Sequence, residues 1–280
     1  MILVTGATGT VGGEVVRRLP ADRAVRVMTR QTAPCTGVGR AVEVVRGDFG
    51  DERSLARAVE GVTCAFLVTS PVAEGHDERF LRAARLAGVR RIVKLSAAAV
   101  LDRGAVDLIT RRQRAHEELL RASGLQWTLL RPRSFMSNTL SWAPSIRAQG
   151  VVRALYGSSP IACVDPRDIA DVAVRALTED GHEGRSHEIT GPEAITVVEQ
   201  TAQLSALLGR PLRYEELTED EARAVLRARH PEPVAEALLH SARRQFEGAK
   251  AGVRLTVSEV TGRPARSFRG WAADHLAAFV

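Results

Sequence analysis

The glycine-rich segment near the N-terminus constrains the fold more than any other part of the sequence. Gly6, Gly9 and Gly12 stand at the spacing G-x-x-G-x-x-G. A short apolar run over residues 1–5 precedes them, and a helical pattern over residues 14–19 follows them. A strand, a tight glycine turn and a helix in this order are typical of the first unit of a dinucleotide-binding fold.

The pattern that starts there continues as a regular alternation of strands and helices. The predicted strands are residues 1–5, 25–29, 42–46, 64–69, 91–96 and 127–130. The predicted helices between them are residues 14–19, 54–59, 77–87 and 111–122. This βαβ spacing predicts an α/β fold with a doubly wound parallel Rossmann sheet, covered by helices on both faces.

The remainder of the chain is less regular and richer in helix signals. Capping patterns open three helices, at Asp165-Pro166-Arg167-Asp168, Thr196–Glu199 and Thr218–Glu221. Residues 217–250 are mostly helical in pattern, with a break near residues 230–233. We expect residues 1–134 to form an NADP-binding Rossmann core. Residues 135–280 then complete that core and form a smaller, mostly helical C-terminal substrate cap or lid.

The glycine turn is the expected seat of a pyrophosphate, because glycines let the backbone approach it and the helix N-terminus offers free N–H groups. The predicted contacts are Gly6, Thr8, Gly9, Thr10, Val11 and Gly12. The second strand ends in Thr29, Arg30 and Gln31, where NAD-binding folds usually carry an acid. Arg30 can bind a 2′-phosphate, so we predict NADPH as the cofactor. The alternative for Arg30 is a solvated surface side chain.

Two further strand ends are expected beside the cofactor. Asp48 follows the third strand, where it could accept a hydrogen bond from the adenine amino group or serve equally well in a turn or helix cap. Val68, Thr69 and Ser70 follow the fourth strand, at the edge of the sheet where ligands bind. For Thr69 and Ser70 the alternative is to cap the next segment.

The charge pattern argues against nucleic acid as a partner. The chain has a formal net charge of +6, but its arginines are scattered among Asp and Glu residues. The sequence contains no lysine-rich run and no arginine stripe with interleaved aromatics. A basic chain also suits an anionic ligand.

Nothing in the sequence indicates a membrane or secreted protein. No apolar run approaches the ~20 residues of a membrane span, and a strand that starts at Ile2 leaves no room for a signal peptide. Cys35, Cys64 and Cys163 lie far apart, and the histidines lack the clustering of a metal site. We therefore expect a cytoplasmic protein without a metal, as a monomer or a homodimer.

A set of short motifs extends over nearly the whole chain. In order they are the glycine turn, Gly47-Asp48, Lys94-Leu95-Ser96, Ser123-Gly124-Leu125, Leu130-Arg131-Pro132, Phe135-Met136, Asp165-x-x-Asp168-Ile169-Ala170 and Thr190-Gly191-Pro192. Together they resemble the NmrA-like, atypical branch of the extended short-chain dehydrogenase/reductases. That family includes NADPH-dependent quinone, imine and ketone reductases, and also redox-sensing regulators that bind the cofactor without turnover.

The resemblance implies roles for residues beyond the glycine turn. Ser96 matches a serine that hydrogen-bonds the substrate carbonyl, and is the candidate catalytic residue. Pro132 and its neighbours match the segment beside the nicotinamide, and Leu95 is also expected to contact the cofactor. The expected substrate pocket consists of Ala97, Phe135, Met136, Trp142 and Tyr156. The alternative for its aromatic residues is ordinary core packing, with a hydrogen-bonded hydroxyl for Tyr156.

The chain lacks the Tyr–Lys pair with which reductases of this superfamily donate a proton. Its tyrosines and lysines are Tyr156, Tyr214, Lys94 and Lys250, and no two of them have the spacing Tyr-x-x-x-Lys. If Glu117 is the acid of the family's helix, the pair would fall at Ile109 and Gln113. His116 is the nearest imidazole, but its neighbours Glu117 and Glu118 favour a solvated helix face.

The missing pair limits the substrates that the chain can reduce. The donors left are the Ser96 hydroxyl, backbone N–H groups, or a phenol of the substrate itself, which favours a quinone or an aromatic hydroxyketone. The arginine-rich, lysine-poor composition resembles that of high-GC actinobacterial proteins, and the branch includes Tyr-less angucyclinone ketoreductases. The resemblance thus implies an NADPH-dependent reductase of an aromatic polyketide ketone or quinone. The main alternative is a non-catalytic NADP(H)-sensing regulator, and a sugar-nucleotide epimerase is a weaker one.

Overall fold

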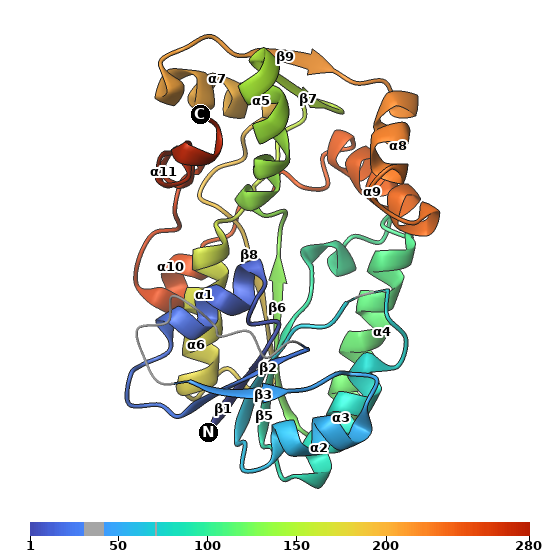
Figure 1. The fold of residues 1–280 in the computed structure, drawn as a ribbon, viewed down its shortest axis with the longest axis vertical. Helices are drawn as coiled ribbons and strands as arrows, with labels where there is room; N and C mark the ends of the chain where they lie inside the picture. Colours follow the sequence, from blue (N-terminus) through green and yellow to red (C-terminus); the bar gives the residue numbers. More distant parts are fainter. Residues whose placement is uncertain (31–41, 71) are drawn as a thin grey trace.

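The computed structural model describes residues 1–30, 42–70 and 72–280. These residues form a seven-stranded parallel sheet in the order β3-β2-β1-β4-β5-β6-β8, and a separate two-stranded parallel sheet of β7 and β9 (Figure 1). The strands are β1 Ile2–Thr5, β2 Val25–Thr29, β3 Glu43–Arg46, β4 Cys64–Leu67, β5 Arg91–Leu95, β6 Gln126–Pro132, β7 Val151–Ala154, β8 Arg185–Ile189 and β9 Arg213–Glu216. The predicted doubly wound Rossmann sheet is confirmed.

Helices cover both faces of the large sheet, with α2, α3 and α4 on one side and α1 and α6 on the other (Figure 1). The α-helices are α1 Thr10–Arg18, α2 Glu52–Val59, α3 His76–Leu86, α4 Leu108–Ala122, α5 Ala143–Gln149, α6 Pro166–Thr178, α7 Val197–Leu208, α8 Glu219–Arg227, α9 Glu232–Phe246, α10 Thr256–Thr261 and α11 Phe268–Asp274. Short 3₁₀ segments are η1 Ala98–Leu101, η2 Met136–Trp142 and η3 Leu276–Ala278.

Alternation along the central strands explains the two faces. Ile2 and Val4 of β1 belong to the core that α1 and α6 cover, whereas Leu3 belongs to the core under α2 and α3. All three side chains are at most 5% exposed. A parallel strand buried on both faces needs such a continuous apolar run, which the sequence of β1 supplies.

The first helix begins earlier than the sequence pattern indicated. We expected it to begin at Glu14, after the glycine turn, but α1 begins at Thr10, with Gly9 as its extended N-cap residue. Gly12 and Gly13 therefore lie within the first turns of the helix. Glycine has low helix propensity, which is why the pattern favoured a turn there. Here the close approach of the turn to the helix requires small residues and outweighs that preference.

The second half of the chain contributes to the large sheet and also builds a separate layer above it. Strand β8 pairs with β6, and α6 packs against α1. Helices α8 and α9 lie above α4 (Figure 1), and the break between them falls over residues 228–231. Both predicted capping boxes, at Thr196 and Thr218, are present. The division of the chain at residue 134 stays a prediction.

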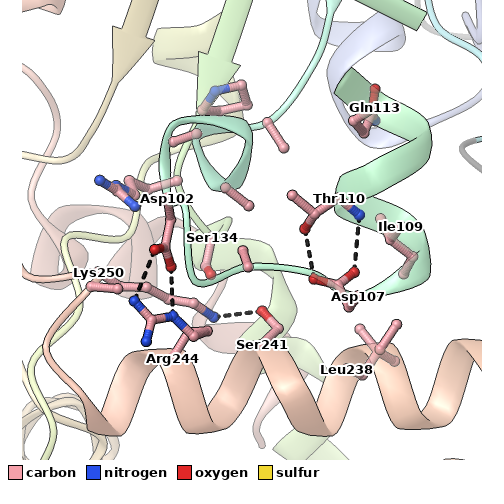
Figure 2. A pocket seen from close by; sticks show the side chains of 18 of the residues that line it. Asp102, Asp107, Ile109, Thr110, Gln113, Ser134, Leu238, Ser241, Arg244 and Lys250 are labelled. Carbon is pink, nitrogen blue, oxygen red and sulfur yellow. Dashed lines mark hydrogen bonds and ion pairs between the residues drawn. The ribbon is translucent and has the colours of Figure 1, made fainter. Parts of the chain in front are cut away.

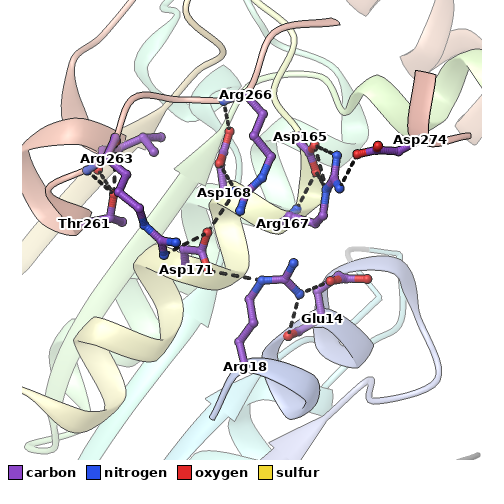
Figure 3. A network of polar contacts seen from close by, with 11 residues as sticks. Glu14, Arg18, Asp165, Arg167, Asp168, Asp171, Thr261, Arg263, Arg266 and Asp274 are labelled. Carbon is purple, nitrogen blue, oxygen red and sulfur yellow. Dashed lines mark hydrogen bonds and ion pairs between the residues drawn. The ribbon is translucent and has the colours of Figure 1, made fainter. Parts of the chain in front are cut away.

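A polar network ties α6 to the C-terminal segment (Figure 3). Asp165 caps α6, as expected, and its carboxylate also binds the Arg167 guanidinium at 2.7 Å. Arg167 reaches Asp274 of α11 at 2.6 Å. The expected capping role of Asp168 is wrong. Its buried carboxylate instead accepts a 2.8 Å hydrogen bond from the backbone N–H of Arg266 and forms an ion pair with the guanidinium of Arg266.

Candidate active site

The glycine turn is closed tightly enough that side chains are excluded from it. Gly6 has φ +63°, and its carbonyl accepts a 2.9 Å hydrogen bond from the N–H of Gly9. A Cβ on Gly12 would lie 2.2 Å from the Gly6 oxygen. No side chain caps α1 at Gly9, so its first N–H groups are available to an anion. This cradle fits a pyrophosphate, with Thr10 in the first turn and Val11 buried beneath it.

A cavity of about 790 Å³, which we call the adenosine cavity, opens beside this turn. It is lined by Gly6, Thr8, Met28, Thr29, Arg30, Gly47, Asp48, Phe49, Val68, Ser70 and His76. Seven of these residues, from Gly6 to Ser70, are among the predicted cofactor contacts, whereas Phe49 and His76 were not expected. Gln31, which stood beside Arg30 in the prediction, lies outside the described residues.

Asp48 has the turn role that the sequence left open, and its hydrogen bond to the adenine amino group stays a prediction. It lines the adenosine cavity, and its Oδ1 accepts a 2.7 Å hydrogen bond from the N–H of Gly50. Its own N–H donates to the Ser54 hydroxyl at 2.9 Å. The turn therefore fixes the carboxylate at the cavity wall. Gly47 is required beside it, because a Cβ there would lie 2.5 Å from Cγ of Met28.

Thr69 faces a buried polar cluster behind the strand ends, and it is not among the residues that line the adenosine cavity. Its hydroxyl donates to Oδ2 of Asp77 at 2.6 Å and accepts from Nζ of Lys94 at 3.1 Å. Lys94 and Asp77 form an ion pair in which each side chain is 1% exposed. Burial lowers the pKa of Lys94, and the Asp77 carboxylate opposes that shift.

The expected solvated face for His116 is wrong. The residue is 8% exposed, and its Nδ1 lies 3.4 Å from Oδ2 of Asp77. Burial lowers the pKa of His116, although Asp77 opposes the shift. The neighbouring Glu117 is also buried. Of the two acidic neighbours that suggested solvent, Glu117 is paired with Arg121 and Arg131 inside the protein, whereas Glu118 is exposed.

Ser96 is committed to a partner within the protein. Its hydroxyl donates a 2.6 Å hydrogen bond to Oε1 of Glu117, which also accepts from Nε of Arg131 at 2.9 Å. Burial raises the pKa of Glu117, but hydrogen bonds from Arg131 and Ser96 outweigh it and give a net lowered pKa. Because an ionised carboxylate holds the hydroxyl hydrogen, Ser96 has none to donate to a substrate carbonyl in this arrangement.

The cavity beside Ser96, which we call the reaction cavity, has a volume of about 400 Å³ (Figure 2). Of the predicted site residues, Ser96, Ala97, Pro132 and Phe135 line it. Leu95 is absent from the lining, because its partly buried side chain packs against the core under α1 and α6. The other lining residues are Ala98, Ala99, Asp102, Ala105, Asp107, Ile109, Thr110, Gln113, Arg133, Ser134, Asn138, Ala237, Leu238, Ser241, Arg244, Ala249 and Lys250.

Ile109 and Gln113 thus face the reaction cavity, one turn apart on α4. They are the positions expected for the family's Tyr and Lys if Glu117 is the acid of that helix. Oε1 of Gln113 is buried without a hydrogen-bond partner among the described residues. Neither side chain can act as a general acid. The cavity wall at this position is therefore shaped for binding and carries no proton donor.

A second cavity, of about 370 Å³, adjoins the first and is mostly apolar. The two cavities share Ser134, Phe135, Asn138 and Leu238 in their walls. The second, which we call the apolar cavity, is further lined by Thr139, Ser141, Trp142, Ala154, Leu155, Ile161, Cys163, Val197, Gln200, Leu217, Ala222, Val225, Leu226, Ala242 and Gln245. Trp142 thus lies on the wall of this cavity, which helices α8 and α9 cover, and its contact with a substrate stays a prediction.

Two expected pocket residues lie elsewhere. Met136 is 1% exposed and packs in the core near Gly191, since η2 turns its side chain away from both cavities. Tyr156 has φ +54°, its hydroxyl donates to Glu219, and its ring packs at 4.9 Å from that of Phe246. Neither residue lines the reaction cavity or the apolar cavity. The pocket prediction was wrong for both.

The sequence reasoning missed the polar end of the reaction cavity. Asp102 follows β5, whereas Ser241, Arg244 and Lys250 come from α9 and the loop after it, more than a hundred residues later. No local motif marks them. The one available signal was that Lys250 is a rare lysine in an arginine-rich chain.

Neither a metal centre nor a membrane-spanning helix is found among the described residues. No group of three or more His, Cys, Asp or Glu side chains that could hold a metal ion occurs in the part of the chain that the structure describes. Over the same residues, no helix has the length and apolar character needed to cross a bilayer.

The glycine cradle, the adenosine cavity and the reaction cavity at the carboxyl ends of the strands together define an NAD(P)H-binding Rossmann oxidoreductase. A family model described as NAD(P)H-binding matches residues 6–180. The chain belongs to this NAD(P)H-binding family, within the NmrA-like atypical short-chain dehydrogenase/reductases. It is an NADPH-dependent oxidoreductase, which excludes the non-catalytic regulator.

Three similar proteins extend this assignment. The chain is 60% identical, over 100% of its length and 99% of the relative's, to the (4-alkanoyl-5-oxo-2,5-dihydrofuran-3-yl)methyl phosphate reductase of Streptomyces griseus subsp. griseus. It is 37% identical, over 100% of its length and 99% of the relative's, to the NAD(P)H azoreductase of Xenophilus azovorans. The crystal structure of an Escherichia coli NADPH-dependent quinone oxidoreductase complexed with NADPH superposes with a TM-score of 0.84 at 28% identity and covers 99% of each chain.

Proposed function

We propose that the protein uses NADPH to reduce the activated carbon–carbon double bond of an alkanoyl butenolide phosphate. This is the compound class in the name of the relative that is 60% identical over the whole chain. The observation that carries the proposal is the wall of the reaction cavity, where Ile109 and Gln113 replace a proton-donating pair. The substrate must therefore be one that accepts hydride without a strong general acid.

The butenolide meets this requirement. Its ring double bond is conjugated with both the lactone carbonyl and the alkanoyl ketone. When bound, NADPH supplies a hydride, which forms a C–H bond at the ring carbon that bears the phosphomethyl group. The electron pair of the double bond then becomes an enolate shared by the two carbonyl oxygens. Water protonates the ring carbon between them, so the product gains one hydride and one proton.

Main-chain and side-chain positioning supply the remaining catalysis. We place the ring in the reaction cavity between Pro132 and Ile109, where the largely apolar wall would hold it for hydride transfer. Gln113 presents an amide to the same space. The Glu117 carboxylate holds Ser96 and Arg131, which fixes the ends of β5 and β6 under the cavity. In the proposal the residues that line the cavity orient the substrate, Glu117 and Arg131 support them from behind, and none of them transfers a proton.

The apolar cavity supports the same assignment. It opens from the reaction cavity along the shared wall of Phe135 and Leu238, and its far wall includes Trp142, Val225 and Leu226. An alkanoyl chain attached to the ring would leave the reaction cavity in this direction. Burying its methylene groups contributes about 0.8 kcal/mol each.

A second candidate is the aromatic polyketide ketone or quinone expected from the resemblance. The azoreductase and quinone oxidoreductase relatives favour it, because their named substrates are conjugated acceptors. An angucyclinone-like ketone would need its own phenol as hydrogen-bond donor, since Ser96 already donates to Glu117. The cytoplasmic location and the monomeric or homodimeric state stay predictions.

The proposal is tested by following NADPH consumption with the butenolide phosphate, an angucyclinone-type ketone, a simple quinone and an unconjugated ketone. We expect the highest kcat/KM for the butenolide phosphate and no turnover of the unconjugated ketone. NADPH deuterated at the transferred position should place deuterium on the ring carbon that bears the phosphomethyl group. Deuterium at the ketone carbon, or faster reduction of the angucyclinone, would contradict the proposal.

A further inference from the structure

Lys250 extends into the polar end of the reaction cavity (Figure 2). Its backbone is held in place, because the Lys250 carbonyl accepts a 3.0 Å hydrogen bond from the N–H of Ala162. Its Nζ donates to the Ser241 hydroxyl at 2.8 Å. In the part of the chain that the structure describes, no carboxylate forms an ion pair with this ammonium group.

The charges around Lys250 are unbalanced. The carboxylate of Asp102 is taken by Arg244, at 2.7 and 2.8 Å. Asp107 caps α4 through the N–H and the hydroxyl of Thr110, at 2.9 and 2.7 Å. Neither acid forms an ion pair with Lys250, although both carboxylates favour its charged form from across the cavity. An ammonium group with spare donors and no direct ion-pair partner is suited to an anionic ligand.

A second cation on the cavity wall strengthens this conclusion. Arg133 donates to Glu188 at 2.7 Å, but that carboxylate also accepts from Arg254 at 2.8 Å, so one acid serves two guanidinium groups. Burial, followed by the charge of Arg133, lowers the pKa of Lys250 to about 8. The two cations repel one another across the cavity end, and a bound anion would relieve that repulsion.

We propose that Lys250 and Ser241 form the binding site for the phosphate group of the substrate, with Arg133 adding positive charge behind them. The inference rests on the proposed function and assigns residues to its phosphorylated substrate. The phosphates of NADPH do not need this site, because the glycine cradle and Arg30 lie at the adenosine cavity. A phosphate held at Lys250 leaves the ring beside Ile109 and directs the alkanoyl chain into the apolar cavity.

The competing role for Lys250 is proton donation to the enolate. The two roles predict different kinetics. A phosphate-binding lysine affects the KM of phosphorylated substrates alone, whereas a proton donor affects kcat with and without the phosphate.

The experiment compares wild type, Lys250→Met and Lys250→Arg with the butenolide phosphate and with its dephosphorylated hydroxymethyl analogue. Lys250→Met should raise the KM for the phosphate about 10–100-fold, the range of a lost hydrogen bond to a charged group. Its kcat should stay within about threefold, and the analogue should be unaffected. Lys250→Arg should recover part of the affinity. Arg243→Met, which removes an exposed cation of α9 outside the reaction cavity, is the matched control and should behave as wild type.

Binding of inorganic phosphate to the NADPH-loaded protein, measured by calorimetry, separates this inference from the proposed function. Weak phosphate binding that Lys250→Met abolishes supports the site even if the butenolide is not reduced. Equal phosphate binding by wild type and Lys250→Met overturns it. So does a wild-type enzyme that reduces both butenolides with the same kcat/KM, or a Lys250→Met variant that loses kcat equally on both.

Discussion

At the scale of single residues, Arg30 is the side chain that we predict to select NADPH over NADH. It lies exposed on the wall of the adenosine cavity, at the end of β2 where an acid would favour NADH. Arg30→Ala should raise the KM for NADPH about 10–100-fold, because a charge-assisted contact to the 2′-phosphate is lost. The KM for NADH should change less than about twofold, given that it has no such phosphate. Steady-state kinetics with both cofactors measures this, and an equal loss for both would rule out the assignment.

Ser96 illustrates how a family motif can be retained while its role changes. Ser96→Ala removes the 2.6 Å hydrogen bond to Glu117, and Glu117 keeps its pairs with Arg131 and Arg121. We expect kcat/KM for the butenolide phosphate to stay within about threefold, with a loss of about 1 kcal/mol in the free energy of unfolding in urea. A hundredfold loss of activity in a fully folded variant would show that the hydroxyl turns to the substrate.

Lys250 makes substrate affinity depend on pH. The charged groups that share its cavity are Arg133, which disfavours its charge, Asp102 and Asp107, which favour it, and Arg244, which is paired with Asp102. Since its pKa is lowered to about 8, the ammonium form, and with it phosphate affinity, is lost as pH rises through that value. The kcat/KM for the phosphorylated substrate should therefore fall as pH rises above about 8, whereas the kcat/KM for the dephosphorylated analogue should not change over this range. Identical profiles for the two substrates would contradict the inference.

At the level of elements, the sequence predicts the strands of the Rossmann half well, because most are short runs bounded by Gly, Ser or Pro, as at Gly6, Gly47, Ser96 and Pro132. Helix limits are less certain, and α1 begins within the glycines for a tertiary reason that no local propensity contains. The cavities are the hardest part to predict. Their walls combine residues after β5, on α4 and on α9, and only packing brings those segments together.

Helix α9 is held over the reaction cavity by the ion pair between Arg244 and Asp102. A second contact holds α9 in the same place, because Nε2 of His240 lies 3.1 Å from the carbonyl oxygen of Gly104. Arg244→Ala should therefore loosen α9 and raise the KM for the substrate several-fold, with the Kd for NADPH unchanged. Fluorescence titration with NADPH and steady-state kinetics distinguish the two. Arg243→Ala is the control on the same helix, and an equal effect there would assign the change to helix stability.

At the scale of the whole molecule, the sequence did not predict the buried cluster of charged residues. Its members Lys94, Asp77 and His116 come from β5, α3 and α4, and the local pattern predicted only a strand, a helix and a solvated helix face there. Their contacts stabilise the layer behind the cofactor edge only when all three elements are in place. Capping motifs such as the one at Asp165 are local, so they could be predicted. The hydrogen-bond partner of Asp168, Arg266, lies ninety-eight residues away in the sequence and could not.

That long-range pair carries the last prediction, on how the C-terminal segment stabilises the fold (Figure 3). Asp168 is 1% exposed, and Arg266 supplies its charge partner. Arg266→Ala should lower the free energy of unfolding by about 1–3 kcal/mol, less than for a fully buried pair because the guanidinium is partly exposed. Arg263→Ala, whose side chain is 67% exposed, is the matched control and should change stability by less than about 0.5 kcal/mol.

The pH dependence of this loss provides a second check. Burial raises the pKa of Asp168, and Arg266 opposes the shift, so the variant should hold its proton to a still higher pH. The folded variant then binds more protons than the unfolded chain below that pKa, and its stability falls as pH rises through it. The difference from wild type should therefore be largest at neutral pH and shrink toward pH values near the ordinary Asp pKa. A difference that grows on acidification would mean that Arg266 stabilises the fold through other contacts.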